Sequence, residues 1–403
     1  MTHRLYYTDP ALQSFDAVVA SVERAGSRLA VTLDRTAFYP SSGGQPFDTG
    51  TLGGLPVVDV VEQDDGSVVH FLAPPDDVGG PNPVQAGQVV DGVVDWPRRF
   101  DHMQQHTGQH VLSAAFGRQF GARTVSFHLG SAASTIDLAR ELTPAELLAG
   151  EIEANRIVWE DRAVSIRFAT AEEAAQLPLR KESVREGTRR LIDVDGFDLS
   201  ACGGTHVART GAIGVIAVTS WERFKGGQRV EFLCGARALG RFRALRDSMG
   251  AAARLLSLLP EELPAAVERL QAESREQQRA LAALRLELAG FRAGELAASA
   301  EVTSAGRLVL ASCDADASGL KALASAIVAR PGYLVVLLST TRPALAVVAR
   351  SPDVSASAQR VVASLTARFG GRGGGKPELA QCGGLDGPAE AILDAARTTL
   401  VAG

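Results

Sequence analysis

The sequence predicts an α+β protein built in several parts, and three observations carry this prediction. Apolar and polar residues alternate along stretches of the first 95 residues, as in half-buried strands. A helical spacing of apolar residues begins near Trp96. Beyond residue 300, short strands and helices follow one another. We therefore expect a β-rich, barrel-like N-terminal subdomain (1–95), an α+β domain (96–239), a helical coiled-coil arm (240–300) and a small C-terminal α/β domain (301–403).

The composition is that of an ordinary soluble protein of more than one domain. The 403 residues are 46% hydrophobic and 22% charged, and no run approaches the ~20 apolar residues of a membrane helix. The start, "MTHRLYYTDPAL", lacks the apolar core of a signal peptide, so we expect a cytoplasmic protein without disulfides. The net charge of −5 argues against a uniformly basic surface, but it leaves room for local patches that hold nucleic acid.

The first 95 residues contain strand patterns and turn signals. "FDAVVASVE" and "RLAVTLDRT" alternate apolar and polar residues, and a turn-rich loop, "FYPSSGGQPFDTGTL", follows them. "LPVVDVVEQDDGSVVHFL" predicts a hairpin that turns at Asp64, Asp65 and Gly66.

The α+β domain opens with the helical stretch "RRFDHMQQHTGQHVLSAAFGRQF". Further on, "STIDL" and "VSIRFAT" have strand patterns, and "PAELLAGEIEANRIVWE" between them predicts a helix. Thr143 suits the N-cap of that helix, and Pro144 suits its first position.

The arm shows the seam spacing of a coiled coil, with Pro260 and Pro264 expected to break the helix before it. Three uses remain open for the arm: it separates two domains, pairs two subunits, or buries the seam against its own hairpin. Beyond it, we expect a buried sheet with helices, a glycine-rich loop and a last helix. The seam positions are Val267, Leu270, Ser274, Gln277, Leu281, Leu284, Leu288 and Phe291.

Two distant pairs of residues predict a metal site. His106 and His110 lie four apart in "HTGQH", and on a helix such positions are neighbours, with Cβ atoms about 5–6 Å apart. Cys202 and His206 lie four apart in "CGGTH", where the glycines let the backbone bend. Either pair alone is common without a metal. Together, three imidazoles and one thiolate suit one zinc ion per chain.

The motif differs from that of metalloproteases, because Thr107 and Gln109 occupy the positions between the histidines and no glutamate base is present. Four protein ligands form a closed shell, as in structural zinc sites, whereas catalytic sites keep one position open. Either one ligand, His206 or Cys202, is loosely held, or the zinc mainly positions a substrate.

These stretches resemble the editing domain of alanyl-tRNA synthetases and its freestanding AlaX-type relatives. "FYPSSGGQPFDTG" is similar to the glycine-rich loop of that family, and "DWPRRFDHMQQHTGQHVLSAAF" to its metal helix. "DVDGFDLSACGGTHVARTGAIG" is similar to its second metal segment, and "FKGGQRVEFLCG" to its closing strand. "GGRGGGKPELAQCGG" (370–384) resembles the core of the DHH-associated domain that helps to hold tRNA. The chain thus resembles the long AlaX form, or the C-terminal half of the synthetase, without room for charging tRNA.

The resemblance implies a trans-editing deacylase that hydrolyses mischarged Ser-tRNA(Ala), with Gly-tRNA(Ala) as a second candidate substrate. A site that selects serine needs a group to hydrogen-bond its hydroxyl. In "ARTVSFHLG", Thr124 and Ser126 share one side by the two-residue period of a strand. The resemblance places the serine-sensing hydroxyl in this strand, with Thr124 as the first choice. The rival interpretations are a tRNA-binding module with structural zinc, and a hydrolase of another small ester or amide.

The remaining site candidates are polar and basic residues that suit the acceptor end of tRNA. The resemblance places Gln45 of "SSGGQPFDTG" in the site, although the glycines alone would make a tight turn. "GGRGGGK" is no Walker A motif, because Pro377 stands where serine or threonine must reach magnesium. Several clusters suit RNA phosphates, although a solvated helix face explains "RKESVREGTRR" equally well. These candidates are Arg180, Lys181, Arg185, Arg189, Arg190, Lys225, Arg229, Arg372 and Lys376.

Overall fold

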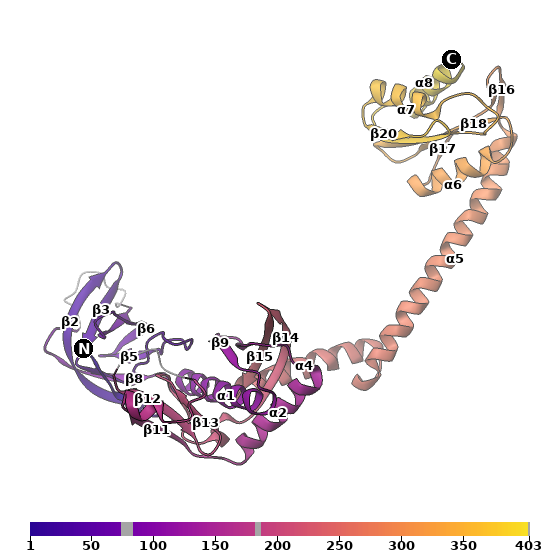
Figure 1. The fold of residues 1–403 in the computed structure, drawn as a ribbon. Coiled ribbons are helices and arrows are strands. Elements are labelled where there is room, and N and C mark those ends of the chain that lie inside the picture. The colour runs from indigo at the N-terminus through magenta and orange to yellow at the C-terminus, as the bar shows by residue number, and fades with distance from the viewer. Residues whose placement is uncertain (74–83, 182–186, 402–403) are drawn as a thin grey trace. The chain divides into compact units, whose positions relative to one another are not determined.

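The computed structural model describes residues 1–73, 84–181 and 187–401, and it has the predicted mixed α+β architecture. Its chain forms two compact units, Met1–Ala251 and Ala252–Gly403 (Figure 1). Among the described residues, no helix combines the length and the apolar character needed to cross a membrane.

The first unit begins with a closed barrel, which confirms the barrel-like prediction for the N-terminal subdomain. The inward positions of its alternating strands form an apolar core that includes Val31, Leu52 and Val60. The hairpin at residues 64–66 joins two neighbouring barrel strands, as predicted. In barrel order, the strands are β2 (Ser14–Ala25), β3 (Arg28–Leu33), β7 (Val68–Leu72), β6 (Leu55–Glu62), β5 (Gly50–Leu52) and β8 (Val89–Val94).

The barrel is fastened to helix α1 (Trp96–Phe120) by a buried arginine. Arg99 is fully buried and donates hydrogen bonds to both carboxylate oxygens of Asp48 and to the carbonyl oxygens of Pro10 and Ala37. A buried guanidinium is tolerated only when its charge and its N–H groups are satisfied in this way. The pair therefore fixes where α1 leaves the barrel.

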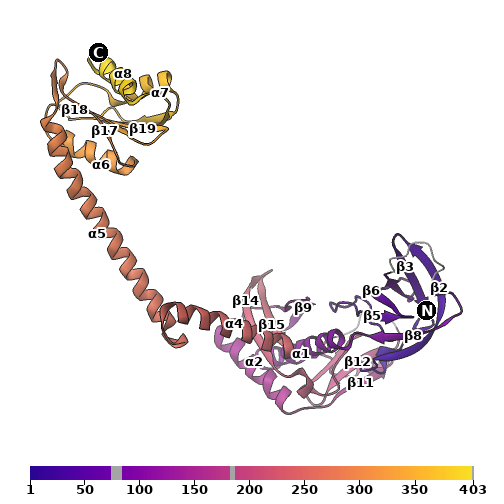
Figure 2. The same cartoon turned by 180° about the vertical axis from the view of Figure 1, so that it is seen from behind.

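Helix α1 packs between two antiparallel sheets (Figure 2). It contacts β9 and β15 of one sheet and β13 of the other. The helix is buried almost continuously from His102 to Phe116, although its sequence is rich in polar residues. The first sheet has the order β14 (Ile216–Phe224), β15 (Gly227–Cys234), β10 (Ser134–Leu138), β9 (Thr124–Leu129), and the second β11 (Val164–Ala169), β12 (Arg189–Val194), β13 (Asp198–Ala201).

Helix α2 (Pro144–Trp159) covers the other side of α1 and confirms the predicted helix start. Thr143 is its N-cap, Pro144 is its first residue, and a capping box with Glu146 satisfies the first turn. Short connecting elements are β1 (His3–Arg4), β4 (Arg35–Thr36) and α3 (Ala171–Ala175).

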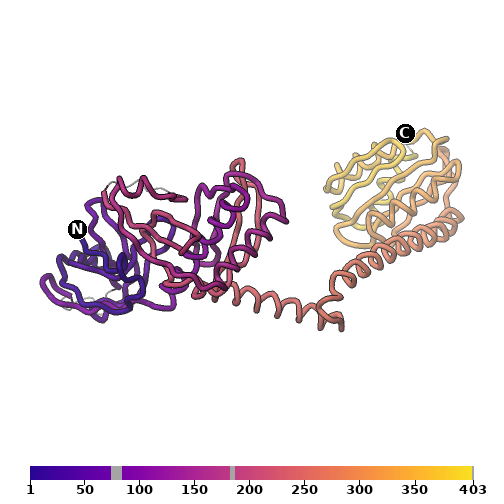
Figure 3. Tube along the Cα trace, turned by 60° about the horizontal axis from the view of Figure 1, so that its bottom comes forward, coloured from indigo at the N-terminus to yellow at the C-terminus, as the bar shows by residue number. Residues whose placement is uncertain are grey.

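The second unit begins at Ala252 and contains the predicted small α/β domain, a six-stranded sheet with helices on both faces. Figure 3 shows α6 (Ala317–Val328) beside the last part of α5 (Leu263–Ala298), and both pack on one face of the sheet. Helices α7 (Ala358–Phe369) and α8 (Ala389–Val401) cover the other face. The sheet order is β16 (Glu301–Thr303), β17 (Gly306–Cys313), β18 (Tyr333–Ser339), β19 (Ala344–Arg350), β21 (Leu379–Leu385), β20 (Arg372–Gly375).

The expected glycine-rich loop near residue 370 is instead an antiparallel pair of strands. β20 pairs with β21 and forms the edge of the sheet. Gly373 approaches Cys382 so closely that an added Cβ would lie 2.3 Å from the Cβ of that cysteine. Because only glycine allows this approach, the composition that suggests a loop in fact permits a flat edge strand.

The arm consists of α4 (Gly235–Leu256), a short 3-10 turn at Pro260–Glu262, and α5. Pro260 follows the end of α4, whereas Pro264 lies in the first turn of α5 and does not break it. Along α5, the predicted seam residues Leu281, Leu284 and Phe291 are exposed. The alanines on another side of the helix, Ala289, Ala293 and Ala297, are buried in the core beneath the six-stranded sheet, and Ala266 near the start of α5 is buried as well.

Candidate metal centre

The two histidines of α1 present their imidazoles on one side of a buried helix. His106 and His110 are 1% and 3% exposed, and their ring centroids lie 5.4 Å apart. Their spacing of four residues places them one helical turn apart, so no distortion of the backbone is needed.

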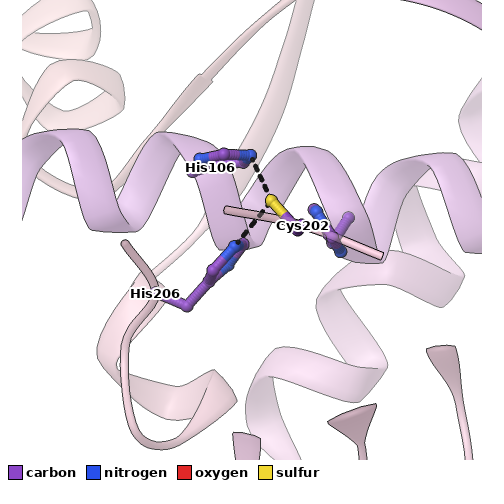
Figure 4. Close-up of side chains that lie close together, drawn as sticks. His106, Cys202 and His206 are labelled. Carbon is purple, nitrogen blue, oxygen red and sulfur yellow. Dashed lines mark hydrogen bonds between the residues drawn. The ribbon is translucent and has the colours of Figure 1, made fainter. Parts of the chain in front are cut away.

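Cys202 and His206 reach the same point from a loop that follows β13. Sγ of Cys202 lies 3.4 Å from Nε2 of His106 and 3.4 Å from Nε2 of His206 (Figure 4). The ring of His206 lies 4.4 Å from that of His106 and 4.7 Å from that of His110, measured between centroids. The structure therefore brings the two pairs, His106 with His110 and Cys202 with His206, together as predicted.

The four side chains fit a zinc ion. Their ligand atoms all lie within 4.8 Å of one another. Zinc bonds of 2.0–2.3 Å in a tetrahedron place neighbouring ligand atoms about 3.3–3.8 Å apart. The distances of 3.4 Å from Sγ of Cys202 to Nε2 of His106 and to Nε2 of His206 fall in this range. Three imidazole nitrogens and a thiolate are also donors that zinc accepts readily.

Each histidine of the cluster has its other ring nitrogen held by a polar partner. Nδ1 of His106 donates to Oε1 of Gln45 at 2.8 Å, and Nδ1 of His110 donates to Oδ2 of Asp198 at 3.0 Å. Because an amide oxygen and a carboxylate only accept, both imidazoles are in the tautomer that leaves Nε2 free for a metal. Nδ1 of His206 lies 3.2 Å from Oγ1 of Thr107.

The ionisation of the cluster also suits metal binding. Burial opposes loss of the Cys202 proton, but the nearby His106 and His206 outweigh burial and hold the pKa of the thiol well below its usual value. Burial lowers the pKa of both His106 and His206. His110 differs: burial opposes its protonation, yet the hydrogen bond to Asp198 is among the effects that raise its pKa.

Gln45 holds both halves of the cluster together. It is 2% exposed, its Nε2 donates to Oγ1 of Thr205, and its Oε1 also accepts from the backbone N–H of Thr205. The same oxygen accepts from His106, so one amide links the glycine-rich loop of the barrel region, α1 and the "CGGTH" loop.

Asp198 and Thr107 are the site residues that the sequence analysis missed. Asp198 is 5% exposed, binds His110, and accepts a two-point ion pair from Arg180. The sequence did contain a signal for Asp198, a carboxylate four residues before Cys202. Metal-binding histidines commonly donate a hydrogen bond to a carboxylate, so this residue was a candidate partner. The sequence analysis expected Arg180 among the tRNA contacts. In the structure, its guanidinium forms an ion pair with the Asp198 carboxylate.

Thr124 and Ser126 lie at the start of β9 and have different partners. Oγ1 of Thr124 donates to Oγ of Ser113 at 2.8 Å, and Gln109 donates to the same Oγ. Ser126 donates to Oδ2 of Asp137 at 2.5 Å instead. A bulge shifts the register between β9 and β10 at this point, so alternation along the strand does not describe the pair fully.

Two cavities flank the cluster. The first, of about 950 Å³, is bordered by His106, Cys202 and Arg190. The second, of about 920 Å³, is bordered by His110, Ser113 and Thr124, and also by Ser126. Phe127 and Lys181 border both cavities, and the Lys181 ammonium lies 5.0 Å from the centre of the Phe127 ring.

The other basic candidates lie in varied surroundings. Arg190 is buried and donates to the backbone carbonyls of Tyr7, Cys202 and Gly204, whereas Arg189 precedes it at the start of β12. Arg229 pairs with Asp137, and Lys225 lies at the turn between β14 and β15 with its ammonium over Phe224. Arg372 and Lys376 are exposed at the edge strand of the second unit, and Arg185 lies outside the described residues.

Two family models match the chain. Residues 189–231 match the threonyl and alanyl tRNA synthetase second additional domain, and residues 305–402 match the DHHA1 domain. The alanyl-tRNA editing protein AlaX-L of Pyrococcus horikoshii is 30% identical over 98% of this chain and 98% of its own length.

Longer relatives match as well. An alanine–tRNA ligase of Pyrococcus abyssi is 33% identical over 94% of this chain, and one of Halobacterium salinarum is 37% identical over 98%. The chain covers 42% and 43% of these two ligases, less than half of each. Among solved structures, the C-Ala domain of Aquifex aeolicus alanyl-tRNA synthetase aligns with 26% of this chain and 96% of its own, at 20% identity and a TM-score of only 0.24.

Proposed function

The chain belongs to the AlaX-type alanyl-tRNA editing family, in its long form, and from this premise we propose that it hydrolyses mischarged Ser-tRNA(Ala). In this reaction, water adds to the ester carbonyl carbon, the bond to the terminal ribose oxygen breaks, and serine leaves while the tRNA regains its hydroxyl. Glycine attached to the same tRNA is a second candidate substrate. A tRNA substrate also implies a cytoplasmic protein.

The observation that carries the proposal is the position of the metal cluster between two cavities. An aminoacylated tRNA end has a nucleotide on one side of its ester and an amino acid on the other. The first cavity touches the cluster at His106 and Cys202, and the second touches it at His110. An ester placed at the cluster therefore has room on both sides.

A zinc ion held by His106, His110, Cys202 and His206 would act as a Lewis acid that polarises the ester carbonyl or lowers the pKa of water. The protein itself supplies orientation. Gln45 and Asp198 hold two imidazoles in the metal-binding tautomer, and the low pKa of Cys202 keeps its sulfur anionic.

Cys202 is the donor that we propose to be loosely held. Its side chain is only partly buried and borders the first cavity, whereas His206 is 2% exposed and its loop is anchored by Thr107. A donor at the cavity wall is the one that a substrate meets first. This distinction makes a closed shell of four donors compatible with a catalytic site.

Selection of serine is assigned to the hydroxyl cluster of the second cavity. Thr124 and Ser113 already form a hydrogen-bonded pair there, supported by Gln109. A substrate hydroxyl can join this network, whereas the methyl group of alanine would leave it without that partner. Replacing Thr124 by valine keeps the shape and removes the hydroxyl. We expect at least a 10-fold loss of serine preference in kcat/KM, and an unchanged preference would refute the assignment.

The exposed side of α5 supports a second proposal, that the arm pairs two copies of the chain. Leu281, Leu284 and Leu288 are 49–62% exposed and follow the spacing of a coiled-coil seam. A coiled coil needs a second helix, which another copy of the chain would supply. Sedimentation of the full chain tests this, with L284E predicted to dissociate the dimer.

We further propose that Arg372 and Lys376 contact tRNA phosphates from the edge of the second unit.

The activity is tested with Ser-tRNA(Ala) and Ala-tRNA(Ala), each incubated with the zinc-loaded protein and with chelator-treated protein. Selective loss of serine that the chelator abolishes supports deacylation at a zinc site. Binding of tRNA without loss of either amino acid supports the rival module with structural zinc, which a closed shell of four donors favours. Absence of both effects leaves a hydrolase of another small ester or amide.

A further inference from the structure

We propose that two copies of the chain pair along α5 in parallel and in register, so that Glu287 of each copy faces Arg292 of the other. The inference rests on the proposed pairing of two copies, and it adds the direction and the register of the pair. α5 is one continuous helix of 36 residues (Figure 1). Three of its features carry the inference: an uncovered apolar seam, the charges beside this seam, and two polar positions within it.

The first feature is an apolar seam that the chain itself does not cover. Leu281, Leu284, Leu288 and Phe291 are 49–70% exposed, and they recur at spacings of three, four and three residues. The alanines of α5 that pack beneath the six-stranded sheet lie on the opposite side of the helix. The seam is therefore left for a partner, and a helix with the same spacing is the partner that it fits.

The second feature is the charge on the two flanks of the seam. The charged residues of one flank, Glu273 and Glu287, are both acidic, and those of the other flank, Arg285 and Arg292, are both basic. Parallel helices bring each flank against the opposite flank of the partner, five positions further along, so Glu287 meets Arg292. Antiparallel helices bring like flanks together, where no acidic residue can meet a basic one. The charges therefore favour the parallel direction.

Glu287 and Arg292 are also available for such a contact. Both are exposed, and in the part of the chain that the structure describes neither forms an ion pair. Residues five apart on one helix lie on different faces, whereas the pair that α5 does form, Arg269 with Glu273, is four apart. A parallel dimer gives Glu287 and Arg292 a partner twice, once on each side of the seam.

The third feature sets the register. Ser274 and Gln277 are polar interruptions of the seam. In the parallel register each one faces its own copy, and two glutamine amides can both donate and accept hydrogen bonds. An antiparallel pair matches its polar positions only by placing Ser274 opposite Gln277. That register sets Leu284 against Val267 and leaves Phe291 beyond the end of the partner helix, so it covers less of the seam.

Disulfide crosslinking of the zinc-loaded full chain tests the direction, with oxidised glutathione as the oxidant. In the parallel register the two copies of residue 284 face each other, so we expect L284C to form a covalent dimer. In the antiparallel register they lie about 25 Å apart, the helical distance between residues 267 and 284. A disulfide needs Cα atoms within about 7 Å, so only a mixture of V267C and L284C chains would then crosslink.

The controls for crosslinking are the wild-type protein and L286C. Leu286 is 66% exposed but lies on the outer side of the helix, away from the seam. We expect neither control to form a covalent dimer. Equal crosslinking of L286C and L284C would show random collision rather than a defined seam, and it would overturn the proposal.

Charge variants test the contact between Glu287 and Arg292, with the dimer dissociation constant measured by sedimentation equilibrium at low salt. R292E places two glutamates together on each side of the seam, and we expect dimerisation about 10-fold weaker. E287R should have a similar effect, whereas the double variant E287R/R292E restores opposite charges and should regain the wild-type affinity. The matched control is R279E, the same change at an exposed arginine on the outer side of α5.

The outcomes separate this inference from the proposed function. A wild-type chain that stays monomeric overturns both the pairing and its direction, and deacylation measured on the same preparation is judged independently. A dimer that crosslinks only as the mixture of V267C and L284C retains the pairing but overturns the parallel direction. If R292E and R279E weaken the dimer equally, or the double variant fails to recover, the contact between Glu287 and Arg292 is wrong.

Discussion

The two pairs of candidate metal ligands meet at one point, but they are held in different ways. His106 and His110 lie on a helix that is buried between two sheets, and their relative position follows from helical geometry. Cys202 and His206 lie on a loop whose position depends on neighbours distant in the sequence, among them Gln45, Thr107 and Arg190. The helix pair is thus a rigid platform, whereas the loop pair completes the site only when the fold holds it there.

The largest expected effect comes from removing one ligand of each pair. We expect H106A to lower zinc affinity by about 100-fold or more, because structural zinc binding of about 10–16 kcal/mol is shared among four ligands. C202A should lower zinc affinity less, by about 10-fold, if the partly buried thiolate of Cys202 is the loosely held donor. Competition with a chromophoric chelator measures both affinities, and equal losses would show that the two pairs do not differ in this way.

A smaller effect tests whether the loop must lie against the helix. An added Cβ at Gly204 would lie 2.2 Å from Cε1 of His106, whereas one at Gly203 would meet only the Tyr7 hydroxyl at 3.5 Å. Since overpacking costs about 1–3 kcal/mol, we expect G204A to weaken zinc binding roughly 10-fold or more and to lower the thermal midpoint. G203A is the matched control and should change neither. A G204A protein with normal zinc affinity would mean that the loop has room to move.

The hydrogen bond from His110 to Asp198 should affect zinc affinity about as much as comparable bonds to metal-binding histidines do in other proteins. D198N replaces the carboxylate that accepts from His110 with a neutral amide, and we expect about a 10-fold loss of zinc affinity. D193N, which removes a surface partner of Arg167 on the neighbouring strand, serves as control. Identical zinc affinities of the two variants would exclude a role for Asp198 in orienting His110.

The smallest effect concerns pH and again separates His110 from the rest. Its pKa is raised, whereas the pKa values of His106 and His206 are lowered and that of Cys202 is far below its usual value. As pH falls, His110 is therefore the first of the four to take up a proton and compete with the metal. We expect zinc affinity to fall about 10-fold per pH unit below the pKa of His110. The fall should begin at lower pH in D198N, and an unshifted onset would contradict this assignment.

Local patterns were a sound guide to the elements of this protein. Alternation predicted the barrel strands, and the residues Thr143 and Pro144 predicted the start of α2, because both signals depend on neighbours a few residues away. The same patterns failed where a strand needs close approach to another. The glycines at 370–375 suggested a loop, yet they form an edge strand whose backbone lies against Cys382.

The site shows the same division. The types and spacing of the four candidate metal ligands were visible in the sequence, because each pair is local. The resemblance placed Gln45 in the site, but the hydrogen bonds of Gln45 and the role of Asp198 were not visible in the sequence. Gln45 reaches Thr205 across 160 positions, and Asp198 reaches His110 across 88. Local sequence patterns do not show which polar side chain will contact an imidazole after folding.

The sequence by itself determined most of the elements, the four candidate donors of a metal centre and the resemblance to the family. Only the tertiary structure decided which tautomers the histidines adopt and which of the four candidate donors border a cavity. The physical reason is that periodicity and spacing act over one or two turns of chain. Orientation and solvent access arise when segments a hundred residues apart pack against each other and exclude water.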